Sequence, residues 1–76
     1  MHHELTKTTT DHTLLINDGV NPETEVLYTS EVYERESGKD MVRIYVSSVL
    51  TESLQESFTY LIKGKFKDYQ IEEINF

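Results

Sequence analysis

The chain lacks cysteine, lacks any long apolar run, and has only half as many basic as acidic residues. Without cysteine it can form no disulfide and no zinc–thiolate site, and thiol catalysis is excluded. No apolar stretch approaches the roughly 20 residues that a membrane-spanning helix needs. The N-terminal segment "MHHELTKTTT" contains no apolar core of a signal peptide. We therefore expect a cytoplasmic protein that does not enter a membrane.

The shortage of basic residues narrows the choice of partner. Fourteen acidic residues face seven basic ones, which gives a net charge of −7. Such a balance keeps a small protein soluble and disfavours general nucleic-acid binding, because phosphates would be repelled. A length of 76 residues predicts one domain with a marginal core. We expect a disordered tail at residues 1 to 7 and a single small domain at residues 8 to 76.

Three segments have the composition and alternation of β-strands. Residues 8 to 16, "TTTDHTLLI", are rich in β-branched residues and end at Asn17-Asp18-Gly19, which favours a tight turn. Asn21 and Pro22 could begin a helix, but alternation of apolar residues after them favours a strand. Residues 41 to 50 give the strongest strand pattern. The expected core faces of the second and third strands are Val26, Tyr28, Ser30 and Val32, and Val42, Ile44, Val46, Ser48 and Leu50.

The segment "YERESGKDMVRI", residues 33 to 44, contains a Gly-Lys pair that is also found in phosphate-binding loops. Such a loop would need Gly at position 33 and Ser or Thr at position 40, where this chain has Tyr33 and Asp40. The segment is therefore interpreted as the turn of a hairpin. The apolar faces match only if the loop has an odd number of residues. A three-residue loop, Ser37-Gly38-Lys39, would place Val32 opposite Ile44.

Residues 51 to 63 change to the helical period. Leu54, Phe58, Leu61 and Ile62 would form its buried face. Ser53 with Glu56 fits a capping box, Thr51 is a competing N-cap, and Gly64 is the expected stop.

After the helix, Tyr69 and Ile71 could share one face of a last strand. Ile74 and Phe76 are out of phase with them, which indicates a bulge or a frayed end. The sequence therefore predicts an α+β fold of order β-β-β-α-β, in which one helix packs on one face of a small antiparallel sheet.

Candidate chemical sites are weak, and we expect no enzymatic activity, no cofactor and no metal site. His2 and His3 give a tail with incidental affinity for Cu²⁺ or Ni²⁺. Asp11 and His12 are neighbours on a strand, so they point to opposite faces and cannot act on one proton. The acidic residues around the turn, Glu34, Glu36 and Asp40, match no calcium loop.

The face of the sheet away from the helix is the most informative feature, because one helix cannot cover both faces. It mixes Tyr, Met, Arg and Leu, which are typical of interface cores. The competing interpretation is a sheet face that is partly exposed to solvent and binds nothing, since scattered exposed apolar residues are common. The expected partner-binding residues are Leu27, Glu31, Tyr33, Glu34, Met41, Arg43 and Tyr45, with Glu31 and Glu34 as rim charges.

We therefore expect an acidic protein-binding module, for example an inhibitor or antagonist of a host protein. A variant of this function is a DNA mimic, whose carboxylates would occupy a nucleic-acid site. The order β-β-α-β over residues 25 to 74 is similar, in element order alone, to the layout of a small phage inhibitor of uracil-DNA glycosylase. Two alternatives remain open. The same face could pair with its own copy in a homo-oligomer, or Lys63, Lys65 and Lys67 could contact nucleic acid.

Overall fold

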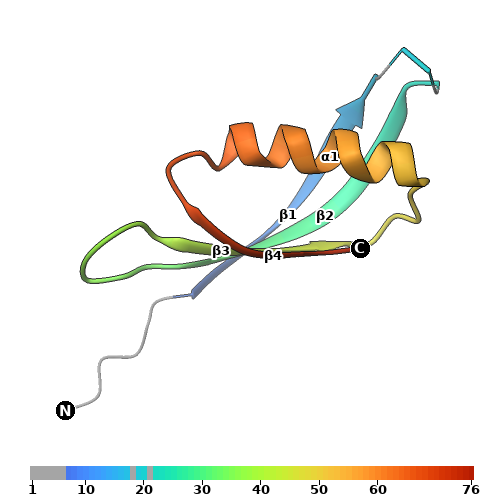
Figure 1. Ribbon diagram of the computed structural model, residues 1–76. Helices are drawn as coiled ribbons and strands as arrows, with labels where there is room; N and C mark the ends of the chain where they lie inside the picture. The colour runs from blue at the N-terminus through green and yellow to red at the C-terminus, as the bar shows by residue number, and fades with distance from the viewer. Residues whose placement is uncertain (1–6, 18, 21) are drawn as a thin grey trace.

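The computed structural model describes residues 7 to 17, 19, 20 and 22 to 76. It contains the elements β1 (Lys7–Ile16), β2 (Thr24–Tyr33), β3 (Met41–Val46), α1 (Glu52–Lys65) and β4 (Gln70–Asn75). The strands form one sheet in the order β1-β2-β3-β4, and the helix lies on one side of it (Figure 1). The predicted α+β class and element order are confirmed. Of the predicted tail, residues 1 to 6 lie outside the described residues, and Lys7 begins β1.

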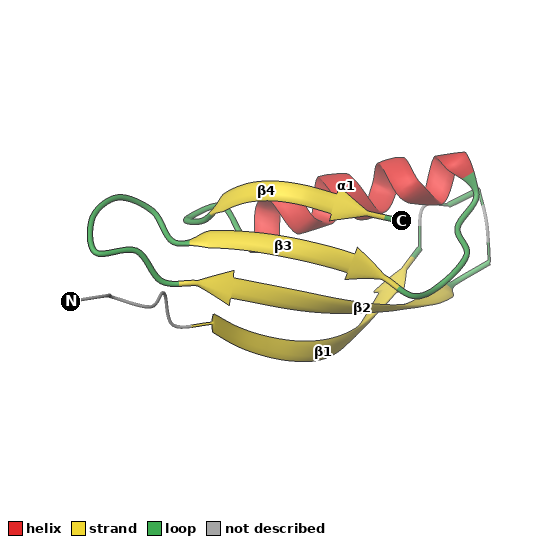
Figure 2. Cartoon of the chain, turned by 90° about the horizontal axis from the view of Figure 1, so that it is seen from below, coloured by secondary structure: helices red, strands yellow, loops and turns green. Residues whose placement is uncertain are grey.

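The sheet is antiparallel over its first three strands and becomes mixed at β4. β2 pairs with β1 and β3 in antiparallel fashion, whereas β4 pairs with β3 in parallel. Two parallel neighbours need a long crossover connection, usually a helix, and α1 lies between β3 and β4 in the chain. Figure 2 views the sheet from below, with the helix behind it, so no helix covers the near side of the strands.

The hairpin between β2 and β3 confirms the predicted turn but has a different length. The loop spans residues 34 to 40, and Val32 lies opposite Val42 instead of Ile44. Within it, Gly38 has a φ of 83°, and the Arg35 N–H donates to Asp40 Oδ1 at 3.2 Å. The three-residue loop was therefore wrong, because Asp40 closes a wider turn. The loop length is still odd, so both strands keep their apolar residues on the same face.

The core lies between the sheet and the helix. Val26, Val42, Ile44, Phe58 and Ile62 are completely buried in it. On the helix the buried residues are four apart, at positions 54, 58 and 62, and buried Phe66 continues this spacing just after the helix. A helix turns once every 3.6 residues, so this stripe drifts by about 40° at each step. Leu61, predicted to be in the core, is consequently left on the flank and is 39% exposed.

The ends of the helix differ from the predicted capping pattern. Thr51 is the N-cap, and its hydroxyl accepts from the Leu54 N–H at 3.4 Å, so the Ser53 capping box does not form the start. The helix continues past Gly64 to Lys65, and the Phe66 N–H donates to the Ile62 carbonyl at 2.9 Å. The helix thus ends two residues later than predicted, and Phe66, which follows it directly, is buried in the core.

Candidate functional site

The side of the sheet away from α1 is called the open face. Strand alternation places Leu27, Glu31, Tyr33, Met41, Arg43 and Tyr45 on this face, as predicted. Glu34 follows β2 in the loop, where it is exposed. In the register of the hairpin, Glu31 lies opposite Arg43 and Tyr33 lies opposite Met41. The structure therefore brings five of the predicted residues together, while Leu27 lies further along β2.

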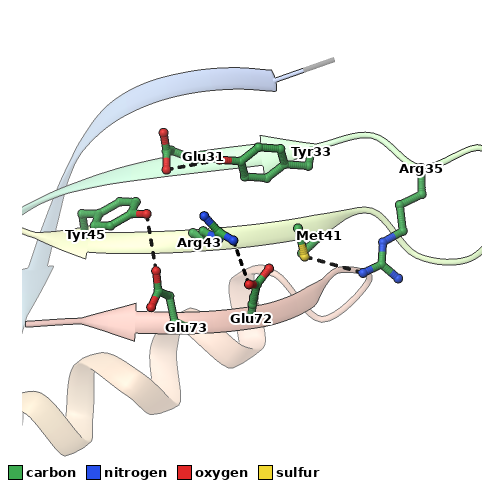
Figure 3. Close-up of polar contacts among 8 residues, drawn as sticks. All are labelled: Glu31, Tyr33, Arg35, Met41, Arg43, Tyr45, Glu72 and Glu73. Carbon is green, nitrogen blue, oxygen red and sulfur yellow. Dashed lines mark hydrogen bonds and ion pairs between the residues drawn. The ribbon is translucent and has the colours of Figure 1, made fainter. Parts of the chain in front are cut away.

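Side chains at the centre of the open face contact one another through charged and aromatic groups (Figure 3). Arg43 Nη2 lies 2.8 Å from Glu72 Oε1, and the guanidinium carbon of Arg43 lies 5.5 Å from the centre of the Tyr33 ring. The Tyr33 hydroxyl donates weakly to Glu31 Oε1 at 3.5 Å. We call the side chains joined by such ion pairs, hydrogen bonds and ring contacts the paired network. It comprises Lys7, Glu31, Tyr33, Arg43, Tyr45, Glu72 and Glu73.

Glu31 belongs to the interior of the paired network. Its Oε2 lies 2.6 Å from the Lys7 ammonium nitrogen, and its side chain is only 15% exposed. The hydrogen bond and charge of Lys7 lower the pKa of the Glu31 carboxyl, and Glu31 in turn raises the pKa of Lys7. Glu31, predicted as a rim charge, is thus partly covered by Lys7 of the edge strand.

A bulge in β4 supplies the second pair of carboxylates. Val42 lies opposite Ile71, but Arg43 lies opposite Glu73, so Glu72 is an extra residue in the strand. The extra residue turns two consecutive carboxylates toward the open face (Figure 3). It also lets both Ile71 and Ile74 pack against the core. The predicted change of phase in the last strand is confirmed, but its effect on Glu72 and Glu73 was missed.

Carboxylates of the paired network raise the pKa values of Tyr45 and Arg43. The Tyr45 hydroxyl donates weakly to Glu73 Oε1 at 3.4 Å. Glu31, chiefly, raises the pKa of Tyr45, with burial and the charge of Glu73 acting in the same direction. Glu72, chiefly, raises the pKa of the Arg43 guanidinium. The ordinary pKa values of Arg and Tyr already lie above the physiological range, so Arg43 is charged and Tyr45 is neutral there, and both shifts act in the same direction.

Met41 lies at the hairpin end of the open face, beside Arg35. Arg35 Nη2 approaches Met41 Sδ at 3.5 Å, and Arg35 Nη1 donates to Gln70 Oε1 at 3.2 Å. Figure 3 shows the Arg35 side chain reaching from the loop toward Met41. Arg35 was not predicted as a site residue, because its loop register could not be read from alternation.

The other half of the open face is a shallow hollow of about 380 Å³. Leu27, which is 47% exposed, lies on β2 and borders the hollow. His12 and Tyr28 also border it, and because their side chains lie on the opposite face they reach it through the main chain. The side chains that line the hollow are those of Asp11, Thr13, Leu27, Thr29 and Ser47. Sequence reasoning missed its polar members as site residues.

Other candidate groups are separated from the open face. His12 stacks on Tyr28 on the helix side, at 4.7 Å between ring centres, and its Nε2 lies 2.9 Å from the Ser30 hydroxyl. Asp11 and His12 thus point to opposite faces, as predicted. Lys63 and Lys65 lie in the last turn of α1, and Lys67 follows it. His2 and His3 lie outside the described residues.

Within residues 7 to 17, 19, 20 and 22 to 76, no group of three or more His, Asp or Glu side chains is placed to hold a metal ion. In the same part of the chain, no helix has the length and apolar character needed to cross a membrane.

The chain matches no protein-family model, no curated protein and no solved structure at a significant level.

Proposed function

We propose that this protein is a small, non-enzymatic protein-binding module that uses the open face to contact its target. The observation that carries the proposal is the position of Tyr33, Arg43 and Tyr45 on the side of the sheet that α1 leaves bare. Tyr and Arg are the residue types that most often dominate the binding energy of protein interfaces. Leu27 and Met41 add apolar surface on either side of them.

The contacts within the paired network support this use of the face. The Tyr33 ring lies against Arg43, and Glu72 fixes the far side of the guanidinium. Side chains that are already held in place lose less conformational entropy when a partner binds. The face is therefore organised before contact, which favours affinity without requiring a large interface.

Charge indicates what kind of surface would be recognised. Lys7 and Arg43 are each neutralised by a carboxylate of the network, while Asp11 and Glu73 have no ion-pair partner in the described part of the chain. Together with the net charge of −7, this favours a basic protein surface as the target. An inhibitor or antagonist that occupies a basic site of a host protein, including a site that normally binds DNA, fits this description.

The test is capture from a lysate of host cells on immobilised protein, read by mass spectrometry. The wild type should retain one stoichiometric protein, and the variant Tyr33→Ala/Tyr45→Ala should lose it while folding normally. Tyr60→Ala is the matched control, since Tyr60 lies on α1, is 79% exposed and is not part of the open face. Retention of the same protein by the double Tyr variant would contradict the proposal.

Two further measurements separate the alternatives. A protein that captures nothing but sediments as a dimer, with dissociation on Tyr33→Ala/Tyr45→Ala, would be a homo-oligomer instead. Recovery of nucleic acid that is released by salt and lost when Lys63, Lys65 and Lys67 are changed to Gln would indicate nucleic-acid contact. Each result replaces the proposed function with one stated alternative.

A further inference from the structure

The two halves of the open face differ in the groups that a partner could contact. In the paired network, both described cations already contact carboxylates, and the Tyr hydroxyls donate to carboxylates as well. In the hollow, by contrast, the side chains are short, and the space above them is empty of protein atoms. The hollow is therefore the part of the face that can receive a side chain from outside.

One carboxylate lies in the hollow among hydroxyl groups. The Thr29 hydroxyl donates to Asp11 Oδ1 at 2.7 Å, which fixes the orientation of the carboxylate. Asp11 has no cationic partner among the residues that the structure describes. The hydroxyls of Thr13, Thr29 and Ser47 can all accept a further hydrogen bond, because each hydroxyl oxygen has two lone pairs. The hollow thus offers an oriented carboxylate and, elsewhere along its walls, neutral hydroxyls that can accept hydrogen bonds.

This arrangement favours lysine over arginine. An ammonium group carries three donors around a single point and can contact one carboxylate oxygen and two hydroxyl oxygens together. A guanidinium binds a carboxylate best as a planar two-pronged fork and leaves neutral hydroxyls beside it unused, whereas the hollow presents one carboxylate together with hydroxyls on its walls. The exposed side chain of Leu27 lies in the same hollow and can pack against the aliphatic stem of a lysine.

We infer that the hollow is a binding site for a lysine side chain of the partner protein, with Asp11 as its counter-ion and Leu27 against its stem. This inference rests on the proposed function, since the lysine is presented by a protein that docks on the open face. The two halves of the open face then have different roles. The paired network provides a rigid contact surface, and the hollow makes binding specific for a basic surface.

The inference is tested on the captured complex by zero-length carbodiimide coupling. This reagent joins a carboxylate to an amine only where the two are in contact, and mass spectrometry then identifies the linked peptides. We expect an amide between Asp11 and a lysine of the captured protein. Asp11→Asn should remove this link and weaken binding by about tenfold or more, since charge-assisted hydrogen bonds contribute about 1.5 to 3 kcal/mol.

Glu25→Gln is the matched control for charge. Glu25 lies opposite Leu15 on β1 and shares the open face, but it does not line the hollow. The control removes the same charge from the same face, so general attraction would weaken binding equally in both variants. We expect Glu25→Gln to change binding by less than about threefold, because a rim charge mainly affects association rate.

The outcomes separate this inference from the proposed function. A partner that is lost with Tyr33→Ala/Tyr45→Ala but binds Asp11→Asn like the wild type, with no link at Asp11, would overturn the lysine site and leave the binding face intact. Links confined to Glu25 or Glu73 would overturn it as well. A link at Asp11 in a complex that tolerates the double Tyr change would instead assign binding to the hollow and remove the paired network from it. Capture of no partner overturns both proposals.

Discussion

The two faces of the sheet are built from alternate residues of the same strands, yet they depend on different physics. On the covered face Ile44 is completely buried against α1, whereas its neighbour Tyr45 points to the open face and contacts Glu73 through its hydroxyl. Burial of apolar surface stabilises the fold, while contacts between half-exposed polar groups add little. The covered face therefore determines whether the chain folds, and the open face can change with little effect on folding.

The largest expected change in stability comes from a substitution on the covered face, and the matching substitution on the open face should have little effect. Ile44→Ala should lower the free energy of unfolding by about 2 to 5 kcal/mol, because it leaves a cavity in a close-packed core. Tyr45→Ala should leave the urea midpoint close to that of the wild type. Urea unfolding followed by circular dichroism measures both. An equal decrease in the free energy of unfolding in the two variants would mean that the open face also stabilises the fold.

A smaller effect of opposite sign is expected at Tyr28 on the covered face. Its side chain is 1% exposed, and its hydroxyl has no hydrogen-bond partner among the described residues. A buried polar group without a partner is destabilising, so Tyr28→Phe should raise the free energy of unfolding by about 1 kcal/mol. Tyr45→Phe on the open face is the control and should change little. A loss of stability in Tyr28→Phe would mean that the hydroxyl is bonded in solution.

The pH dependence of stability should come partly from His12 on the covered face. Burial lowers the pKa of His12 below its ordinary value of 6.5, the charge of Lys65 acts in the same direction, and Asp11 opposes both. The unfolded chain then binds the proton more readily than the folded one. Stability from His12 is thus fully present above pH 6.5 and falls as the pH drops through the lower pKa of the folded state. His12→Gln should flatten this part of the curve, and an unchanged slope would exclude His12 as its source.

The smallest effect is expected at the ion pair between Lys7 and Glu31. The pair lies on the open face, where water and salt screen the charges. Lys7→Gln should lower the melting temperature slightly at low ionic strength, and high salt should remove the difference. Thermal unfolding at two salt concentrations measures this. A difference that persists in high salt would show that the pair behaves as part of the buried core.

Much of this division could be predicted from the sequence. Alternation over residues 26 to 32 and 42 to 44 assigned side chains to the correct faces, because an odd loop length preserves the faces whatever its size. Four-residue spacing predicted the buried contacts of Leu54, Phe58 and Ile62. These are local patterns with a fixed period, and they do not depend on which strands become neighbours.

Features that depend on distant neighbours could not be predicted in the same way. β4 pairs with β3 in parallel across the crossover through α1, and no local pattern of residues 70 to 75 indicates that direction. Glu72 and Glu73 reach the open face only through the bulge in that pairing. Lys7 covers Glu31 because β1 lies beside β2 over its whole length. The hollow arises where short side chains from three separate segments meet.

The place of β4 in the chain also gives the open face a dependence on folding order. β1, β2 and β3 are joined by hairpins and can pair locally, whereas β4 reaches β3 through a crossover that contains α1, so its pairing is less local. An excursion that detaches β4 alone would separate Arg43 from Glu72 and Tyr45 from Glu73, while the hollow would keep its walls. Amide hydrogen exchange should therefore be faster in β4 than in β2. A partner that contacts Glu72 or Glu73 would bind only the docked strand, and by mass action it would slow this exchange.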